Sequence, residues 1–249
     1  MVASRSGGRS LAGKHALVTG ATTPLARVLA VGLAEAGATV SVTTTHALLA
    51  EEVQANSILN ECWAAAGASG QAKTIDLAAP QDAKEAIDAL EREVAPIDIL
   101  VNASYGAELR PVLEVTLAEW QMEIDDSVTT TFVACQAVGQ RMIGRGAGRI
   151  INVVAIAHDR AVPNSTLFSA SQAAVIGLTR ALGVEWGRGE GVQGVMVNAL
   201  GLGFYEETEG PNELAVDVQA ALVYLATEST DDVQGEMLMV DGAFAEPGE

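Results

Sequence analysis

The sequence predicts an α/β protein with a doubly wound parallel sheet in a single domain. Short β-rich runs alternate with helical segments along the chain. Hydrophobic residues make up 49% of the chain but aromatic residues only 4%, so the core must consist mainly of Ala, Val, Leu and Ile. Nothing Pro-, Ser- or charge-rich interrupts the middle. We therefore expect a flexible leader at residues 1–10 and one domain at residues 11–249.

The elements follow one another in a regular order. The β-rich runs predict strands at residues 14–19, 39–43, 73–75, 97–101, 149–153, 192–198 and 237–240. The segments between them predict helices at residues 24–36, 48–66, 81–94, 117–143, 165–186 and 213–226. Strands that alternate with helices need right-handed crossovers, and such crossovers produce a parallel sheet.

The predicted helix at residues 165–186 is apolar on all of its sides. Its apolar residues include Phe168, Ala173, Ala174, Val175, Ile176, Leu178, Ala181 and Leu182. A helix with this pattern is buried on both faces, and the sheet covers only one of them. A second subunit is the simplest cover for the other face, so we expect an oligomer in which Ala174 or Ile176 faces the partner.

Composition excludes several classes of partner. The chain has 32 acidic and 14 basic residues, and a net charge of −18 repels nucleic acid and anionic lipid. Its first ten residues lack an apolar signal segment, and charged residues or glycines break the longest apolar stretches, so no membrane partner is expected. Cys62 and Cys135 fall in predicted helices, which favours buried thiols and a reducing cytoplasm. His15 and His46 have no metal-ligand spacing, so no metal site is expected.

Six sequence blocks occur in an order that resembles one known family. They are LAGKHALVTG at 11–20, DILVNA at 98–103, GRIINV at 148–153, FSASQAAVIGLTRAL at 168–182, VNAL at 197–200 and GEMLMVDGAF at 235–244. Along nearly its whole length the chain resembles a short-chain dehydrogenase/reductase. The resemblance implies a Rossmann sheet of about seven strands, NAD(P) at the carboxyl ends of the strands, and dimers or tetramers.

That family uses a Tyr and a Lys four residues apart on one helix, a Ser at the end of the preceding strand, and an Asn on the long helix. The Tyr moves a proton, the Lys lowers its pKa and holds the ribose, the Ser binds the substrate oxygen, and the Asn positions a water. Here the corresponding positions carry Phe168, Gln172, Ala155 and Ser127. The alignment thus implies that all four groups are replaced and that ordinary dehydrogenase chemistry is lost.

The glycine-rich turn that holds the cofactor phosphates in this family also differs. Its pattern TGxxxGxG reads TGATTPLA here, so that Gly20 remains while Pro24 and Ala26 replace the later glycines. A helix that begins with Thr23 as N-cap and Pro24 in its first turn explains these residues structurally. We expect this structural role rather than phosphate binding.

Other positions related to cofactor binding give the same indication. Three threonines at residues 43–45 stand where the family places an Asp or Arg for the adenosine ribose. Asn102 begins the remnant of the family's NNAG motif, and Tyr105 replaces its glycine, where it could fill the pocket. Asp76 matches an adenine-contacting Asp, or else belongs to the turn before Pro80. We expect that this chain binds no NAD(P) and that the partner subunit carries it.

These substitutions predict a non-catalytic subunit that is inactive by itself and assembles with an active NAD(P)-dependent relative in a hetero-oligomer, such as one acting on hydroxyacyl thioesters. A homodimer or homotetramer is the alternative assembly. The segment at residues 204–211 is short for a substrate lid, which agrees with this prediction.

Two other functions remain open. The chain could be an oxidoreductase of this fold, or another enzyme, that uses non-standard residues. His158 and Asp159, just beyond Ala155, would then supply the acid and base, although a solvated loop also explains them. A cofactor-sensing module is a third hypothesis, which Tyr105 and Pro24 argue against.

Overall fold

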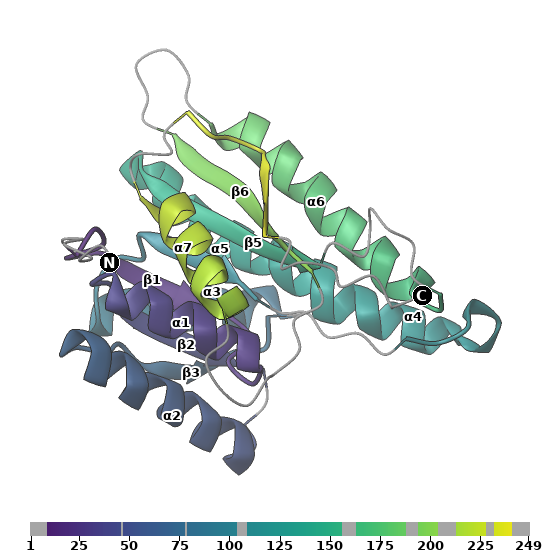
Figure 1. Ribbon diagram of the computed structural model, residues 1–249, viewed down its shortest axis with the longest axis horizontal. Helices are drawn as coiled ribbons and strands as arrows, with labels where there is room; N and C mark the ends of the chain where they lie inside the picture. The colour runs from purple at the N-terminus through teal and green to yellow at the C-terminus, as the bar shows by residue number, and fades with distance from the viewer. Residues whose placement is uncertain are drawn as a thin grey trace.

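The computed structural model describes residues 9–45, 47–77, 79–103, 109–155, 163–187, 194–203, 213–227 and 232–240. These residues form a seven-stranded parallel sheet in the order β3-β2-β1-β4-β5-β6-β7 (Figure 1). The strands are β1 His15–Val18, β2 Thr39–Thr44, β3 Ala72–Thr74, β4 Ile99–Asn102, β5 Gly148–Ala155, β6 Val195–Leu202 and β7 Met237–Val240. The predicted doubly wound α/β fold is confirmed.

Helices cover both faces of this sheet. They are α1 Pro24–Glu35, α2 Leu49–Ala66, α3 Pro80–Glu93, α4 Leu117–Glu123, α5 Thr130–Arg145, α6 Thr166–Trp186 and α7 Glu213–Ala226. A short 3-10 helix, η1, spans Val112–Glu114, and a π-helix, η2 (Ile124–Thr129), joins α4 to α5. In Figure 1, α1, α2 and α7 lie on the near face, with α3 and α5 behind the sheet.

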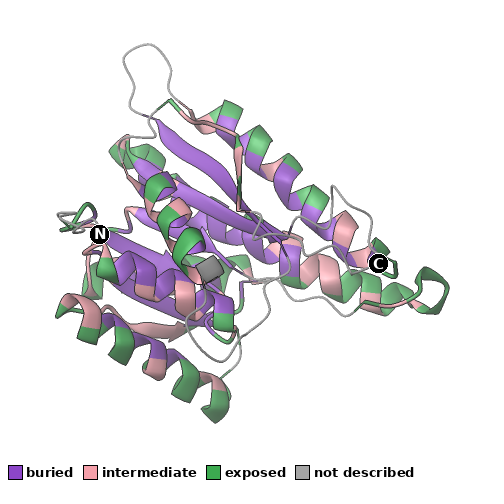
Figure 2. Cartoon of the chain, viewed as in Figure 1, coloured by how far each residue is buried: buried purple, intermediate pink, exposed green. Residues whose placement is uncertain are grey.

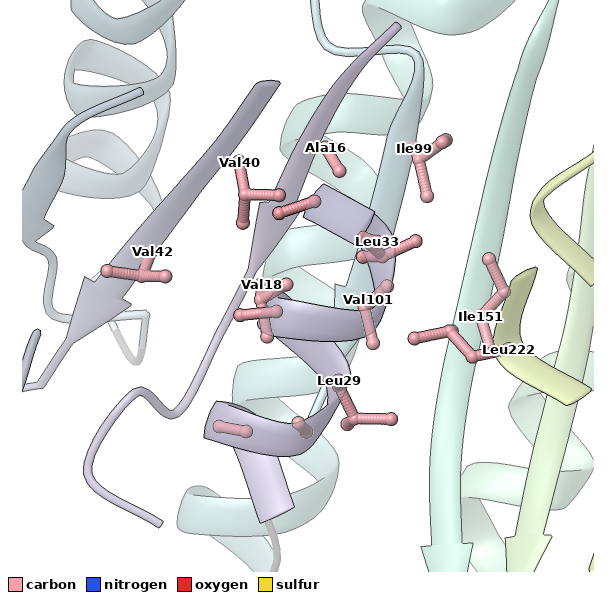
Figure 3. Packing of buried hydrophobic residues seen from close by; sticks show 14 of the residues in the cluster. Ala16, Val18, Leu29, Leu33, Val40, Val42, Ile99, Val101, Ile151 and Leu222 are labelled. Atoms are coloured by element: carbon pink, nitrogen blue, oxygen red, sulfur yellow. The ribbon is translucent and has the colours of Figure 1, made fainter. Parts of the chain in front are cut away.

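Alternation along the strands divides the core in two. Ala16 and Val18 of β1 belong to a cluster with α1, α2 and α7, whereas Leu17 belongs to a cluster with α3 and α5. Successive side chains of a strand point to opposite faces, so a sheet covered twice needs unbroken apolar strands. Figure 2 shows that the central strands of the sheet are buried, and Figure 3 shows Leu29 and Leu33 of α1 packed beside the strands.

Two predicted strands are longer in the structure than the β-rich runs that indicated them. β5 continues to Ala155 and β6 to Leu202, where the sequence predicted ends at residues 153 and 198. The two strands pair in parallel along their whole length, from Gly148 opposite Val195 to Ala155 opposite Leu202. Backbone pairing therefore extends the ladder even through residues of low strand propensity such as Ala155, Ala199 and Gly201.

Helix α6 has one buried and one exposed face, so its apolar residues do not all need a partner. Val175 and Ile176 pack against β5 and β6, whereas Ala174 is exposed. The other exposed residues of the outer face include Ala173, Gly177, Arg180, Ala181, Val184 and Glu185. By length and composition alone α6 could cross a membrane, a test that core helices of soluble proteins also pass. Of the two residues expected to face a partner, Ala174 is the accessible one.

Candidate functional site

The strand order reverses between β1 and β4, and ligands of such sheets bind at the carboxyl ends of the strands beside this point. Thr19 follows β1, and its Oγ1 accepts a hydrogen bond from the backbone N–H of Ala103 at 3.2 Å. The N–H of Ala21 donates to the carbonyl of Thr43 at 2.9 Å. These bonds hold the turn after β1 against the ends of β4 and β2.

The turn itself is built as the sequence predicted. Gly20 has φ 71°, a left-handed conformation that glycine adopts without strain. Thr23 donates its backbone N–H to the carbonyl of Gly20 at 3.3 Å, and its side chain caps α1 by accepting from Ala26 N–H at 3.1 Å. Pro24 occupies the first turn of α1, and its side chain is exposed. The prediction of a Thr23 cap followed by proline is confirmed.

A hollow of about 160 Å³ lies beside this turn. Its lining consists of Ala21, Thr22, Thr23, Pro24, Arg27, Gln54 and Ile58. The guanidinium of Arg27 also contacts Ser57 and Glu61 of α2. Hydroxyl groups, a cation and the N-terminus of α1 together suit a phosphate-bearing group, so the residues present fit the phosphate part of a dinucleotide.

The ends of β2 and β3 carry few charges. Thr44 Oγ1 lies 3.1 Å from Thr74 Oγ1, and Thr43 is buried beside them. Asp76 follows β3 with an exposed side chain, and its carbonyl accepts from Ala79 N–H at 3.1 Å. That bond fits the turn interpretation of Asp76, and the exposed carboxylate leaves the adenine interpretation open.

Asn102 is tied into a buried polar network. Its Nδ2 donates to Asn152 Oδ1 at 2.9 Å and lies 3.4 Å from the sulfur of Cys135. Asn152 in turn donates to Thr179 Oγ1 at 2.9 Å, which links β4, β5 and α6. Burial raises the pKa of the Cys135 thiol to about 12, so this sulfur stays protonated. Asn102 therefore holds the strand ends together from inside.

Ala155, Phe168 and Gln172 lie together at the end of β5. Phe168 and Ala155 form a buried apolar pair, with 3% and 7% of their surfaces exposed. Gln172 is also buried, and its Oε1 accepts the backbone N–H of Ala155 at 2.9 Å. The structure thus brings three of the four expected site residues together, and none of the three has an ionisable side chain.

Ser127, the fourth expected residue, lies in η2. This π-helix interrupts a helix that the sequence predicted as continuous, and π-helical turns are frequent at functional sites. The hydroxyl of Ser127 donates to Glu123 Oε1 at 2.9 Å, and the hydroxyl of Ser171 donates to the same oxygen at 2.6 Å. Sequence reasoning missed Glu123 and Ser171. The spacing of four between Glu123 and Ser127 on one helix was the available signal.

Several expectations concern residues outside those that the structure describes. They are Tyr105, His158, Asp159 and the short segment at residues 204–211, so the plugged pocket, the alternative acid and base, and the reduced lid stay predictions. Among the described residues, no group of three His, Cys, Asp or Glu side chains could hold a metal ion.

Comparison with known proteins identifies related enzymes along almost the whole chain. The short chain dehydrogenase family profile matches residues 14–217. Gluconate 5-dehydrogenase of Gluconobacter oxydans is 29% identical, covering 94% of this chain and 96% of the relative. D-threitol dehydrogenase of Mycolicibacterium smegmatis is 31% identical, covering 94% of each.

A solved structure gives the same result. Gluconate 5-dehydrogenase from Burkholderia cenocepacia, crystallised with NADP and tartrate, superposes with a TM-score of 0.82 at 27% identity. The superposition covers 95% of this chain and 96% of that one.

These relatives contradict two expectations. The predictions of a non-catalytic subunit and of a chain that binds no NAD(P) are wrong, because relatives matched end to end carry the names of dehydrogenases and one holds NADP. The predictions weighed single side chains, whereas phosphate binding in this fold depends mainly on backbone groups and a helix N-terminus. Pro24 lies exposed in the first turn of α1 rather than inside the turn. By sequence and by fold, the chain belongs to the short-chain dehydrogenase family.

Proposed function

We propose that this chain is an oxidoreductase that binds NAD(P)(H) itself and transfers a hydride to or from a small polyhydroxylated substrate, such as a polyol or sugar acid. One observation carries the proposal. Relatives named as dehydrogenases of gluconate and D-threitol match 94% of the chain. The similarity therefore includes both the turn after β1, where the cofactor would bind, and the end of β5, where the substrate would bind.

The residues around the hollow next to Gly20 would hold the cofactor phosphates. Thr22 and the N-terminus of α1 would donate hydrogen bonds, and Arg27, which also forms an ion pair with Glu61, would offer its guanidinium. No carboxylate stands at residues 43–45, so nothing there repels a 2′-phosphate. When bound, the nicotinamide would accept or donate the hydride.

The proton chemistry must use non-standard residues. Phe168 and Ala155 have no proton to exchange, and Gln172 binds a backbone N–H. That these positions are the replaced family tetrad remains part of the proposal. His158 and Asp159 are one candidate acid and base, and the carboxylate beside Ser127 is another.

Calorimetry with NAD⁺ and NADP⁺ tests cofactor binding. We expect saturable binding tighter than about 100 μM, roughly −5.5 kcal/mol, for one of the two. Gly20→Ala should weaken it at least about tenfold, because a β-carbon at φ 71° strains the turn. Gly13→Ala is the matched control, since Gly13 has φ 79° with open space around it. The absence of binding to the unaltered protein would refute the proposal.

Turnover is the second test. The unaltered protein should reduce one of the two cofactors in the presence of D-gluconate or D-threitol, followed by the absorbance of the reduced nicotinamide. A protein that binds cofactor but oxidises neither compound nor any related polyol would keep the cofactor assignment and refute the substrate class.

For the assembly we propose a second copy of this chain as the partner, bound at the exposed face of α6. The expectation of a hetero-oligomer rested on an inactive chain that needs an active partner. That reason no longer holds. Ala174→Glu places a charge on that outer face and should release monomers, measured by native mass spectrometry, whereas Glu185→Gln should not. A cytoplasmic location also stays a prediction, supported by two buried free cysteines.

A further inference from the structure

We infer that Glu123, acting through the hydroxyl of Ser127, is the proton-accepting end of a relay that serves hydride transfer in this chain. The inference rests on the proposed function and makes Glu123 a positioning and relay residue. It concerns a polar cluster formed by Glu123, Ser127 and Ser171 where α4 and η2 meet α6.

The contacts in this cluster are short and converge on one atom. Ser127 Oγ donates to Glu123 Oε1 at 2.9 Å and Ser171 Oγ donates to it at 2.6 Å. Ser171 also lies on the same turn of α6 as the site residues, with its hydroxyl 2.9 Å from the carbonyl of Phe168. The carboxylate of Glu123 therefore links Ser127, which is expected to take part in the reaction, to α6, the helix that carries Phe168 and Gln172.

The exposure of the three side chains differs, and this indicates which way a proton would move through the cluster. Ser127 is 2% exposed and Ser171 is fully buried, whereas Glu123 is only half-buried. A proton that reaches Glu123 through Ser127 can thus pass from the interior to water. The π-helix places Ser127 at this point, because the wider turn shifts the side chains that follow it around the helix axis.

A purely structural role explains this carboxylate poorly. The carbonyl of Phe168 already offers Ser171 an acceptor in its own helix. Partial burial of a carboxylate between helices costs desolvation energy, and an apolar side chain would fill the contact without that cost. Residues 166–179 of α6 carry no charge that would compensate it.

The other carboxylates of α4 and η2 have different partners or lie exposed to solvent. Glu119 pairs with Arg110 and completes a capping box with Thr116. Asp125 accepts from Gln121 and Thr129, both at 3.1 Å. Asp126 is exposed on η2. Among the described residues of these elements, Glu123 is the carboxylate that reaches between the helices.

The proposed step balances as follows for oxidation of an alcohol. The C–H bond of the alcohol would break with its electron pair leaving as hydride, which a bound oxidised nicotinamide would accept, while the O–H electron pair forms the C=O bond. The alcohol proton passes to Ser127 Oγ as the hydroxyl proton of Ser127 moves to Glu123 Oε1. Glu123 then releases the proton to water, and reduction runs the same steps in reverse.

The test compares Glu123→Gln with Glu185→Gln, which makes the same change of charge at an exposed position near the end of α6. Cofactor affinity should stay within about twofold in both. In Glu123→Gln, kcat for D-gluconate or D-threitol oxidation should fall about 100-fold with little change in KM, and the shape of its pH profile should change. Glu185→Gln should keep both.

A spectroscopic measurement accompanies the kinetics. With isotopically labelled glutamate carboxyl groups, the NMR signal absent from Glu123→Gln belongs to Glu123. In the unaltered protein this signal should shift when NADP⁺ binds, whereas the signal of Glu185 should not. A Glu123 signal that the cofactor leaves unchanged would overturn the relay.

The outcomes separate the two proposals. If the unaltered protein turns over and Glu123→Gln keeps its rate and pH profile, the relay is wrong and the proposed function stands. If the unaltered protein binds no cofactor and shows no turnover, both fail. If Glu123→Gln does not fold, Ser127→Ala interrupts the relay one step earlier, and full activity in that variant would overturn the inference.

Discussion

The carboxyl ends of β1 and β5 both belong to the candidate site, yet they are built in different ways. After β1, a turn with Gly20 in the left-handed conformation leaves a hollow lined by hydroxyls and Arg27. After β5, Ala155 and Phe168 pack together. Under the proposed function, the first end would hold the cofactor partly through backbone groups, which side-chain substitutions leave in place. At the second end, side chains would have to supply the proton chemistry.

Helix α6 carries the second end, and a glycine pair on it should show the largest effect. A β-carbon at Gly183 would lie 2.7 Å from the Cα of Gly235, a backbone atom that cannot turn away, whereas Gly177 has open space. Gly183→Ala should lower the free energy of unfolding by about 3 kcal/mol. Gly177→Ala should leave it unchanged or raise it by up to about 1 kcal/mol. Urea unfolding measures both.

The two glycine variants also test whether the ends of β1 and β5 are independent of each other. A folded Gly183→Ala should keep its cofactor affinity, because the hollow beside Gly20 lies on other elements. Equal losses of stability in both glycine variants would show that α6 is not held closely at Gly183.

Gln172→Met should have the next largest effect. The substitution removes the acceptor that the buried N–H of Ala155 uses at 2.9 Å, and the loss of such a hydrogen bond costs about 1.5 kcal/mol. Gln136 on α5 is exposed, so Gln136→Met serves as the control. Thermal unfolding measures the stability, and calorimetry measures the cofactor. A cofactor affinity reduced only in Gln172→Met would mean that Gln172 also contacts the ligand.

Two N-caps allow a smaller test at the first end. Thr23 caps α1 beside the hollow, and Thr116 caps α4 in a capping box. Either threonine replaced by alanine should cost about 1 kcal/mol of stability. Only Thr23→Ala should also weaken NAD(P) binding, since Thr23 lines the hollow. Equal cofactor affinity in both variants would show that the cofactor phosphates do not bind at this turn.

The smallest effect at neutral pH concerns His15, which begins β1 and so lies at the amino ends of the strands, away from the candidate site. Its Nδ1 donates to the carbonyl of Ala95 at 2.7 Å, so Nε2 accepts from Ser41 in the neutral ring. Burial lowers the pKa of His15 below 6.5, although Asp98 and Glu91 oppose the shift. The folded state therefore binds fewer protons than the unfolded state.

The sign of the pH effect follows from that shift. The contribution of His15 to stability is fully present above pH 6.5 and is lost as the pH falls from there towards the lowered pKa. Urea unfolding between pH 7 and 5 should show this loss in the unaltered protein and a smaller one in His15→Gln. Parallel pH dependences would assign the effect to other groups.

Much of the fold could be predicted from local sequence. Mostly apolar runs such as those at β1 and β4 are buried on both faces, and their alternation with helices requires a parallel sheet. The Thr23 cap was also readable, because capping depends on neighbours in sequence. The lengths of β5 and β6 were not, since pairing between the strands decides them.

At the candidate site, the side chains Phe168, Ala155, Gln172 and Ser127 were known from the sequence. Their contacts depend on how the strands and helices pack in three dimensions. The side chain of Gln172 accepts a hydrogen bond from a backbone N–H of β5. Glu123 accepts hydrogen bonds from the hydroxyls of Ser127 and Ser171, which belong to helices far apart in sequence. Such contacts depend on helix packing and on the π-helical turn, which no local pattern encodes. The types of the residues at positions 127, 155, 168 and 172 therefore suggested an inactive chain. They do not show which backbone groups or which other side chains, such as Glu123, lie beside them.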